Sequence, residues 1–162
     1  MTSHEGGCLC GAVRYATNAE PLRVHICFCR FCQRATGSNN MVEPLFARPA
    51  HAVIHGLPAT FSLPSDGSGM QIKISFCRNC GTKLFQEFER FPDVIGGHAG
   101  TFDQPGWFDR TPANTKYLFL EAAQEGTIIP AGFNTFHGSH TLNDGTPAVP
   151  MAYDEPYTVR RG

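Results

Sequence analysis

The sequence lacks the features that direct a chain into a membrane or onto a nucleic acid. Although 41% of its 162 residues are hydrophobic, no apolar run approaches the roughly 20 residues that a membrane-spanning helix needs. Charged residues make up only 17% of the chain, and 13 basic against 14 acidic residues give a formal net charge of −1. Such a balance provides no general electrostatic attraction to phosphates. We therefore expect neither a membrane nor a nucleic acid as partner.

The pattern of a secretory leader is also missing. Met1 is followed by Thr2-Ser3-His4-Glu5, with no apolar run behind it, so we expect a cytoplasmic protein. Disulfides are rare in that compartment, and an odd number of cysteines, seven, cannot all pair. Cysteines separated by one residue also make poor disulfide partners for each other. These absences weigh against a disulfide framework and favour metal ligation.

Neither an internal repeat nor a low-complexity segment divides the chain, and its length fits one domain. Thirteen Phe can contribute to a core, while 17 Gly and 12 Pro are scattered and indicate many turns. From Gly138 onward the sequence becomes polar and proline-rich. We expect a zinc-binding domain over residues 1–137, and over residues 138–162 an irregular C-terminal arm of the same domain. That arm either packs on its own chain or contacts a second subunit of a homo-oligomer.

Alternation of apolar and polar residues predicts a mainly β fold. Residues 70–76 (MQIKISF) and 22–27 (LRVHIC) alternate as half-buried strands do, and each strand ends at a cysteine. Further strands are expected over residues 12–15, 40–46, 52–55, 59–63, 83–88, 94–98 and 116–122. The best helical candidate is short, residues 30–36, with Gly37 in the position of a C-cap.

The seven cysteines of the sequence fall into two groups. Four cysteines form two short knuckles: Cys8, Cys10, Cys77 and Cys80. The other three form a denser cluster: Cys27, Cys29 and Cys32. Four thiolates close a tetrahedral zinc site, whereas three leave a coordination position open, which distinguishes catalytic from structural zinc. The spacing predicts one zinc that holds the fold and a second, open zinc that can do chemistry.

Glycine supports the ligand interpretation. Gly11 follows Cys10 and Gly81 follows Cys80, and a tight metal knuckle often needs the positive φ that glycine adopts readily. An iron–sulfur cluster is the alternative for four thiolates, but the ferredoxin spacings are absent. Paired knuckles that lie far apart in sequence are more typical of zinc.

Four segments together resemble the glutathione-dependent formaldehyde-activating enzyme family, also called the centromere protein V family. They are residues 6–15 (GGCLCGAVRY), 27–38 (CFCRFCQRATGS), 76–82 (FCRNCGT) and 99–103 (AGTFD). The resemblance implies an Mss4-like fold, that is, two antiparallel β-sheets with one short helix, stabilised by a four-cysteine zinc. Phe28 occupies a position where the family commonly has histidine.

The chemistry implied by the resemblance is addition of a thiol to an aldehyde, or the reverse cleavage of a carbon–sulfur bond. A lyase of this kind would act on a small-molecule thiol–aldehyde adduct of the S-(hydroxymethyl)glutathione type, with glutathione as possible co-substrate. The alternative is a non-catalytic zinc scaffold that binds a protein or a small molecule, since fold does not fix function. The three-cysteine cluster discriminates between them, because a scaffold has no evident need for it.

Three further residues are candidates for the site. His98 precedes the fourth motif and is the best candidate for acid–base work, with a structural role as its alternative. Gln33 and Arg34 directly follow Cys32 and could orient a substrate carboxylate.

Overall fold

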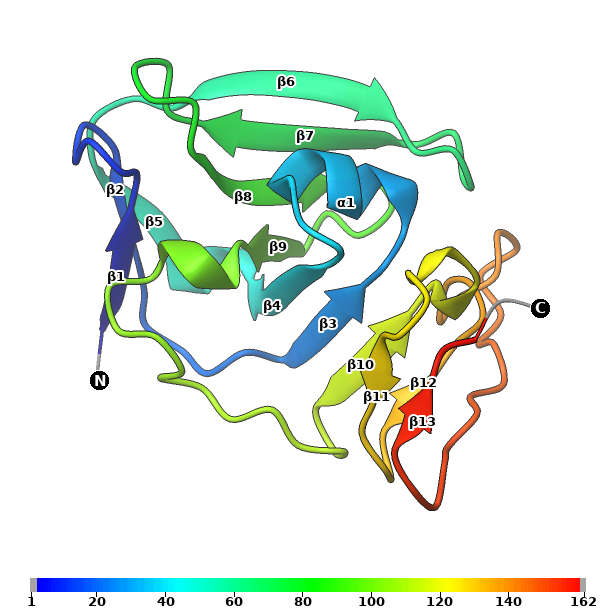
Figure 1. Cartoon of the computed structure of the whole chain (residues 1–162). Helices are drawn as coiled ribbons and strands as arrows, with labels where there is room; N and C mark the ends of the chain where they lie inside the picture. Colours follow the sequence, from blue (N-terminus) through cyan, green and yellow to red (C-terminus); the bar gives the residue numbers. More distant parts are fainter. Residues whose placement is uncertain (1–2, 161–162) are drawn as a thin grey trace. The chain divides into compact units, whose positions relative to one another are not determined.

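The structure, a computed structural model, describes residues 3–160. Two compact units make up the chain (Figure 1). Unit 1 contains the chain up to Leu22 together with Glu43–Asp109, and unit 2 contains Arg23–Val42 and the chain from Arg110 onward. The four-cysteine group therefore belongs to unit 1 and the three-cysteine cluster to unit 2.

Unit 1 is built from antiparallel strands. Its three-stranded sheet has the order β1-β2-β5, with bounds His4–Gly7, Arg14–Thr17 and His51–His55. A second group runs in the order β4-β9-β8-β7-β6, with bounds Met41–Ala47, Val94–Gly97, Lys83–Phe88, Gln71–Phe76 and Ala59–Pro64. The first two residues of β4, Met41 and Val42, belong to unit 2. Two short 3-10 helices, Arg48–Ala50 and Ala99–Thr101, complete the unit.

Unit 2 combines short strands with the α-helix. Strand β10 pairs in parallel with β3 on one side and with β12 on the other; their bounds are Thr115–Leu118, Arg23–Cys27 and Asn134–Thr135. Strands β11 (Ile128–Ile129) and β13 (Tyr157–Thr158) form an antiparallel pair. The helix α1 spans Arg30–Thr36. The prediction of a mainly β chain with antiparallel sheets and one short α-helix is confirmed.

The helix begins and ends where the sequence predicts. Gly37 has φ 68° and donates its N–H to the carbonyl of Gln33, because a left-handed residue after the last turn satisfies a carbonyl that the helix leaves unpaired. At the other end, the Cys29 Sγ accepts the N–H of Cys32 as the N-cap. A predicted cluster cysteine thus also starts the helix.

The prediction of a strand over residues 116–122 is wrong for residues 119–122. Strand β10 ends at Leu118, Phe119 adopts a left-handed conformation with φ 59°, and Leu120–Ala122 form a 3-10 helix. The amides of Phe119 and Leu120 donate to the carbonyls of Gly138 and Phe136. These partners lie far along the chain, so the periodicity of the local sequence carried no sign of them.

Each unit has apolar clusters of its own. In unit 1, Tyr15, Phe46 and Leu84 are fully buried, and Cys8 and Cys77 belong to the same cluster. The Tyr15 hydroxyl lies 2.7 Å from Thr101 Oγ1, so this buried phenol is hydrogen-bonded as burial requires. Unit 2 has two such clusters, one of which includes Cys27 and Cys32, and both are described below. Within residues 3–160, no helix has the length and apolar character to cross a bilayer.

We expect Gly6→Ala to lower the free energy of unfolding by about 1–3 kcal/mol, the typical cost of overpacking a core. A Cβ at Gly6 would lie 2.5 Å from the Tyr15 ring and 2.6 Å from the backbone carbonyl of Thr101, and neither can retreat easily. Gly100→Ala is the matched control, because its Cβ would meet nothing within 4 Å. Urea denaturation of the metal-loaded variants measures both free energies of unfolding. An equal decrease in the two variants would contradict the close packing of Gly6 against Tyr15 and Thr101.

Candidate metal centres

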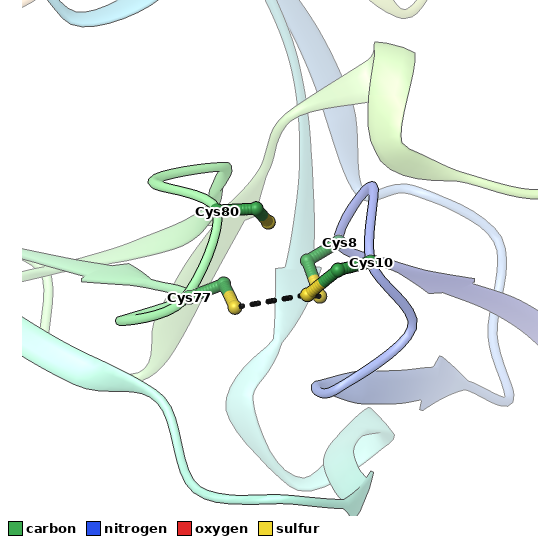
Figure 2. Close-up of side chains that lie close together, drawn as sticks. All are labelled: Cys8, Cys10, Cys77 and Cys80. Atoms are coloured by element: carbon green, nitrogen blue, oxygen red, sulfur yellow. Dashed lines mark hydrogen bonds between the residues drawn. The ribbon is translucent and has the colours of Figure 1, made fainter.

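The four-cysteine group of unit 1 joins two loops. Cys8 and Cys10 lie in the loop between β1 and β2, and Cys77 and Cys80 in the loop between β7 and β8, with all four side chains turned toward one another (Figure 2). Every pair of sulfurs lies within 4.8 Å. Cys8 and Cys10 have their sulfurs 3.6 Å apart, and those of Cys10 and Cys77 are 3.7 Å apart.

These separations suit zinc. Four Zn–S bonds of about 2.3 Å in a tetrahedron place the sulfurs about 3.8 Å from one another. All seven cysteines of the chain lie in the described part and are free thiols rather than disulfides. The donor set and the spacing of this group therefore fit a closed metal site.

The two knuckles repeat one backbone geometry. Gly11 and Gly81 both have φ 74°. The Gly11 amide donates to the Cys8 carbonyl at 3.0 Å, and the Gly81 amide donates to the Cys77 carbonyl at 2.8 Å. A side chain at either glycine would meet no atom within 4 Å, so the left-handed backbone and not space calls for glycine. The positive φ expected from the sequence is confirmed at both positions.

Hydrogen bonds to sulfur favour thiolates at this group. The Thr82 hydroxyl lies 3.1 Å from the Cys80 Sγ and lowers the pKa of that thiol to about 5, with help from the Thr82 amide. Burial raises the pKa of Cys8, but the N–H of Val13, 3.3 Å from its Sγ, and neighbouring thiols outweigh this effect and leave the pKa lowered. Thiolate is the form that binds a metal.

The three-cysteine cluster of unit 2 lies where β3 passes into α1. Cys27 is the last residue of β3, Cys29 is the N-cap, and Cys32 lies in the first turn of the helix. Their sulfurs are within 4.8 Å of one another. Cys27 and Cys32 are buried and Cys29 is half-buried, so solvent reaches the cluster at Cys29.

The thiols of this cluster share their protons unequally. Hydrogen bonds from the Cys27 and Cys32 thiols lower the pKa of Cys29 to about 3. The pKa of Cys27 is raised, first by its hydrogen bond with Cys29 and further by burial. Cys32 also has a raised pKa, because of its bonds with the other two thiols and its burial. At neutral pH the cluster thus holds one thiolate between two thiols.

The Phe28 side chain packs away from the sulfurs. It belongs to one apolar cluster with Ile26, Tyr117 and Ile129. Cys27 and Cys32 belong to another, with Met41, Leu118 and Phe136. Because successive side chains of an extended segment point to opposite faces, position 28 faces the first cluster. A residue there shapes the core of unit 2 and is not placed to bind the same metal ion.

Gln33 connects the helix to the cysteine loop. Its buried Nε2 donates to the Phe28 carbonyl at 2.6 Å and to the Ala122 carbonyl at 2.9 Å, and its Oε1 accepts from Arg30. These contacts fix the backbone between Cys27 and Cys29. A substrate-binding role for Gln33 stays a prediction, as it does for the exposed Arg34 in the last turn of α1.

His98 lies in unit 1, whereas the cluster that it was expected to assist belongs to unit 2. The imidazole is buried, and its Nε2 has no hydrogen-bond partner among the described residues. Burial, with a smaller contribution from Lys83, lowers its pKa to about 4. Because acid–base catalysis works best with a pKa near the working pH, this environment suits packing better. The catalytic role stays a prediction.

A groove beside α1 was not anticipated from the sequence. It has a volume of about 580 Å³ and is lined by Arg30, Gln33, Glu121, Ala122, Gln124 and Glu125. The lining comes from helix α1 and from residues 121–125, which are far apart along the chain. The sequence analysis predicted that a strand would extend to residue 122. Only the position of Arg30 next to Cys29 could have hinted at it.

Comparison with known proteins gives consistent matches. The model of the family described as "Glutathione-dependent formaldehyde-activating enzyme" matches residues 3–121. A Halomonas elongata protein named "Putative glutathione-dependent formaldehyde-activating enzyme" is 28% identical over 102 residues, which are 61% of this chain and 65% of that protein. The match thus spans just under two thirds of that relative.

Among solved structures, the crystal structure of a Rhodobacter sphaeroides protein from a structural genomics programme resembles this chain. It superposes with a TM-score of 0.51 at 20% sequence identity, and the match covers 70% of this chain and 98% of that one. At this level of identity the likeness shows the fold alone.

We expect substitutions in the two cysteine groups to have unequal effects on stability. Cys80→Ser should give unfolded or insoluble protein, because structural zinc supplies on the order of 10 kcal/mol of folding free energy. Cys29→Ser should lose only the second metal and less than about 1 kcal/mol, because serine is a favourable N-cap and keeps the bond to the Cys32 amide. Zinc content and thermal unfolding of the purified variants measure this. An equal loss of stability would contradict the assignment.

Zinc affinity of the three-cysteine cluster should increase steeply with pH. Cys27 and Cys32 are protonated at neutral pH, since their pKa values are raised, and both must lose a proton to bind the metal. The affinity should therefore rise roughly 100-fold per pH unit below those pKa values and fall equally on acidification. Competition with a chromophoric chelator between about pH 6 and about pH 8, with the four-cysteine site already loaded, measures the slope. An affinity that does not change with pH would refute it.

Proposed function

Since the chain belongs to the glutathione-dependent formaldehyde-activating enzyme family, we propose that it is a zinc-dependent carbon–sulfur lyase for a thiol–aldehyde adduct. The adduct is of the S-(hydroxymethyl)glutathione type, and formaldehyde and glutathione are the substrates that the family's description names. The curated relative carries the same description. The adduct, the lyase direction and the role of zinc are the parts that the proposal adds.

A second sulfur cluster with three members is the observation that carries this proposal. Among the described residues, no histidine, aspartate, glutamate or further cysteine joins Cys27, Cys29 and Cys32 within ligand distance. A metal held there keeps one position for an exogenous ligand, which is the mark of a catalytic zinc. A protein that used zinc only to stabilise its fold would need only the four-cysteine site.

The reaction needs one bond to break and one proton to move. In the adduct, the carbon–sulfur bond breaks and its electron pair goes to sulfur, while the hydroxyl loses its proton as the carbonyl forms. The thiolate that leaves then takes up a proton and becomes the free thiol. A zinc ion held by Cys27, Cys29 and Cys32 would supply an open position that stabilises the departing sulfur as thiolate. Addition of the thiol to the aldehyde is the same path in reverse.

The residues of unit 2 provide the surroundings for this chemistry. Cys27 and Cys32 are buried with Met41, Leu118 and Phe136, which exclude water from the inner side of the cluster. Cys29 is half-buried and leaves the outer side accessible. Gln33 fixes the loop between the first two cysteines, so the sulfurs need little reorganisation when a ligand arrives.

The charge of the ligand set decides which chemistry suits the site. Three thiolates already donate much charge to a divalent metal, so the ion is a weaker Lewis acid than one held by three neutral histidines. Activation of water is then less favourable than exchange of one sulfur ligand for another. This difference supports a thiol substrate over hydrolysis.

A non-catalytic zinc scaffold is the competing function, and cobalt substitution separates the two. Thiolate-bound cobalt absorbs by sulfur-to-metal charge transfer, so glutathione should change the spectrum of the wild-type protein when it supplies a fourth sulfur. Cys29→Ser should abolish this response, whereas Asn39→Ala, in the exposed loop after α1, should keep it. Exchange NMR should also show faster interconversion of thiol, formaldehyde and adduct than in buffer, by at least about 100-fold. A spectrum indifferent to every thiol, together with no acceleration, would favour the scaffold.

A further inference from the structure

The Cys29 side chain is turned toward Cys32. Its Sγ accepts the backbone N–H of Cys32 at 3.3 Å as the N-cap of α1. The sulfurs of both residues belong to the group whose members all lie within 4.8 Å of one another. A disulfide needs an S–S distance of about 2 Å, and changes of side-chain rotamer can close a gap of this size. The two sulfurs are therefore placed to bond with each other.

The spacing along the chain favours this pair over the other two. Cys29 and Cys32 are separated by two residues, as in the Cys-X-X-Cys motifs of disulfide oxidoreductases. Cys27 and Cys29 are separated by only one residue, which suits a shared metal ion better than a bond between them. Cys27 also ends β3, where its pairing with Leu118 of β10 holds its backbone. The sulfur of Cys27 is thus the least free to move.

The two sulfurs of the pair differ in their exposure to solvent. Cys29 is half-buried, whereas Cys32 is only 4% exposed. A reagent in solution therefore meets the Cys29 sulfur first, and Cys32 lies behind it. Thiol–disulfide exchange uses such a division, in which one accessible sulfur reacts with the reagent and a second displaces it.

The four-cysteine group contains a second Cys-X-X-Cys pair, Cys77 and Cys80, but its protection differs. Four protein sulfurs fill the coordination sphere of a tetrahedral zinc, so a reagent finds no free position there. Three protein sulfurs leave one position open and hold the ion by one bond fewer. Oxidation should therefore affect the three-cysteine cluster of unit 2 before the group of unit 1.

We propose that Cys29 and Cys32 form a reversible disulfide with each other when they meet a low-molecular-weight disulfide, and that this bond expels zinc from the three-cysteine cluster. The inference rests on the proposed function for the zinc that is lost, and it adds redox control of the same site. The oxidised form of a thiol substrate is itself a disulfide. Oxidation of the thiol pool thus switches the lyase off.

Two exchange steps make the bond. The Cys29 sulfur attacks one sulfur of the reagent, whose S–S bond breaks, and one thiol leaves. The Cys32 sulfur then attacks the Cys29 sulfur of this mixed disulfide and releases the second thiol. The two cysteines are oxidised by two electrons and the reagent is reduced to two thiols. These thiols carry the protons of Cys29 and Cys32 in the metal-free cluster, and take protons from solvent where zinc leaves as Zn²⁺.

Tryptic digestion without reduction identifies the bond, because Arg30 lies between Cys29 and Cys32. After treatment of the zinc-loaded protein with hydroxyethyl disulfide and alkylation of the remaining thiols, mass spectrometry should find residues 24–30 linked to residues 31–34. Dithiothreitol should separate them. Arg78 lies between Cys77 and Cys80 in the same way, so residues 74–78 and 79–83 form the internal control and should stay unlinked. A link in the control pair without one in the cluster would overturn the proposal.

Serine variants identify which sulfurs form the bond. Cys27→Ser should keep the link between residues 24–30 and 31–34, whereas Cys29→Ser should lose it. Cys32→Ser should stop after the first step and keep half of the reagent on Cys29 as a mixed disulfide. If Cys32→Ser does not fold, Cys29→Ser decides, because its serine still caps the helix. A link that persists in Cys29→Ser would assign the bond to Cys27 and refute the pair proposed.

Zinc release separates this inference from the function on which it rests. Formation of the link should release about one zinc ion per chain, measured with a chromophoric chelator, and abolish exchange between thiol, formaldehyde and adduct; dithiothreitol and zinc should restore both. If the link forms and zinc leaves, but the reduced protein accelerates exchange with no adduct, the disulfide stands and the lyase proposal fails. If exchange is accelerated, but excess hydroxyethyl disulfide gives neither link nor zinc release, the lyase proposal stands and the disulfide is overturned.

Discussion

The convergence of four sulfurs from two distant loops is the constraint on which unit 1 depends. Cys10 and Cys77 are 67 positions apart, yet their sulfurs are 3.7 Å apart. Bringing such loops together costs chain entropy that grows with the length of the closed loop. A structural zinc supplies on the order of 10 kcal/mol, comparable with the whole stability of a typical domain. A zinc bound here, as we propose, would add to the core around Tyr15 and Phe46 in holding the strands that carry the two knuckles.

In the function that we propose, the same ligand type serves two purposes, because its surroundings differ. The sulfurs of unit 1 lie in matched glycine turns, receive hydrogen bonds from Val13 and Thr82, and number four. Those of unit 2 number three, cap a short helix, and have their inner side covered by apolar residues. A complete tetrahedron favours a permanent ion, whereas an incomplete one leaves room for a substrate. In that proposal, the number of sulfurs, more than their chemistry, distinguishes the structural site from the reactive one.

Helix α1 links the cluster with the groove. Its first turn holds Cys32 and its N-cap is Cys29, so the cluster shares the rigidity of the helix. On the same helix, Gln33 ties the cysteine loop to Ala122 and orients Arg30. One buried amide thus positions both the sulfur ligands and a cation of the groove. Such sharing explains how a helix of only seven residues can organise a site.

Local chemistry governs the elements that could be predicted from the sequence. Both glycine turns, the helix at Arg30–Thr36 with its Gly37 cap, the mainly β character and the division of the cysteines into four and three were all predictable. Each follows from spacing, periodicity or a conformational preference that a few neighbouring residues express.

The tertiary structure set the features that are built from distant partners. It ended β10 at Leu118, because the carbonyls of Phe136 and Gly138 receive the next amides. It also engaged Gln33 with Ala122 and brought Glu125 to the groove of Arg30. None of these contacts has a local signature, because each joins residues that lie far apart in the sequence and meet only when the chain folds.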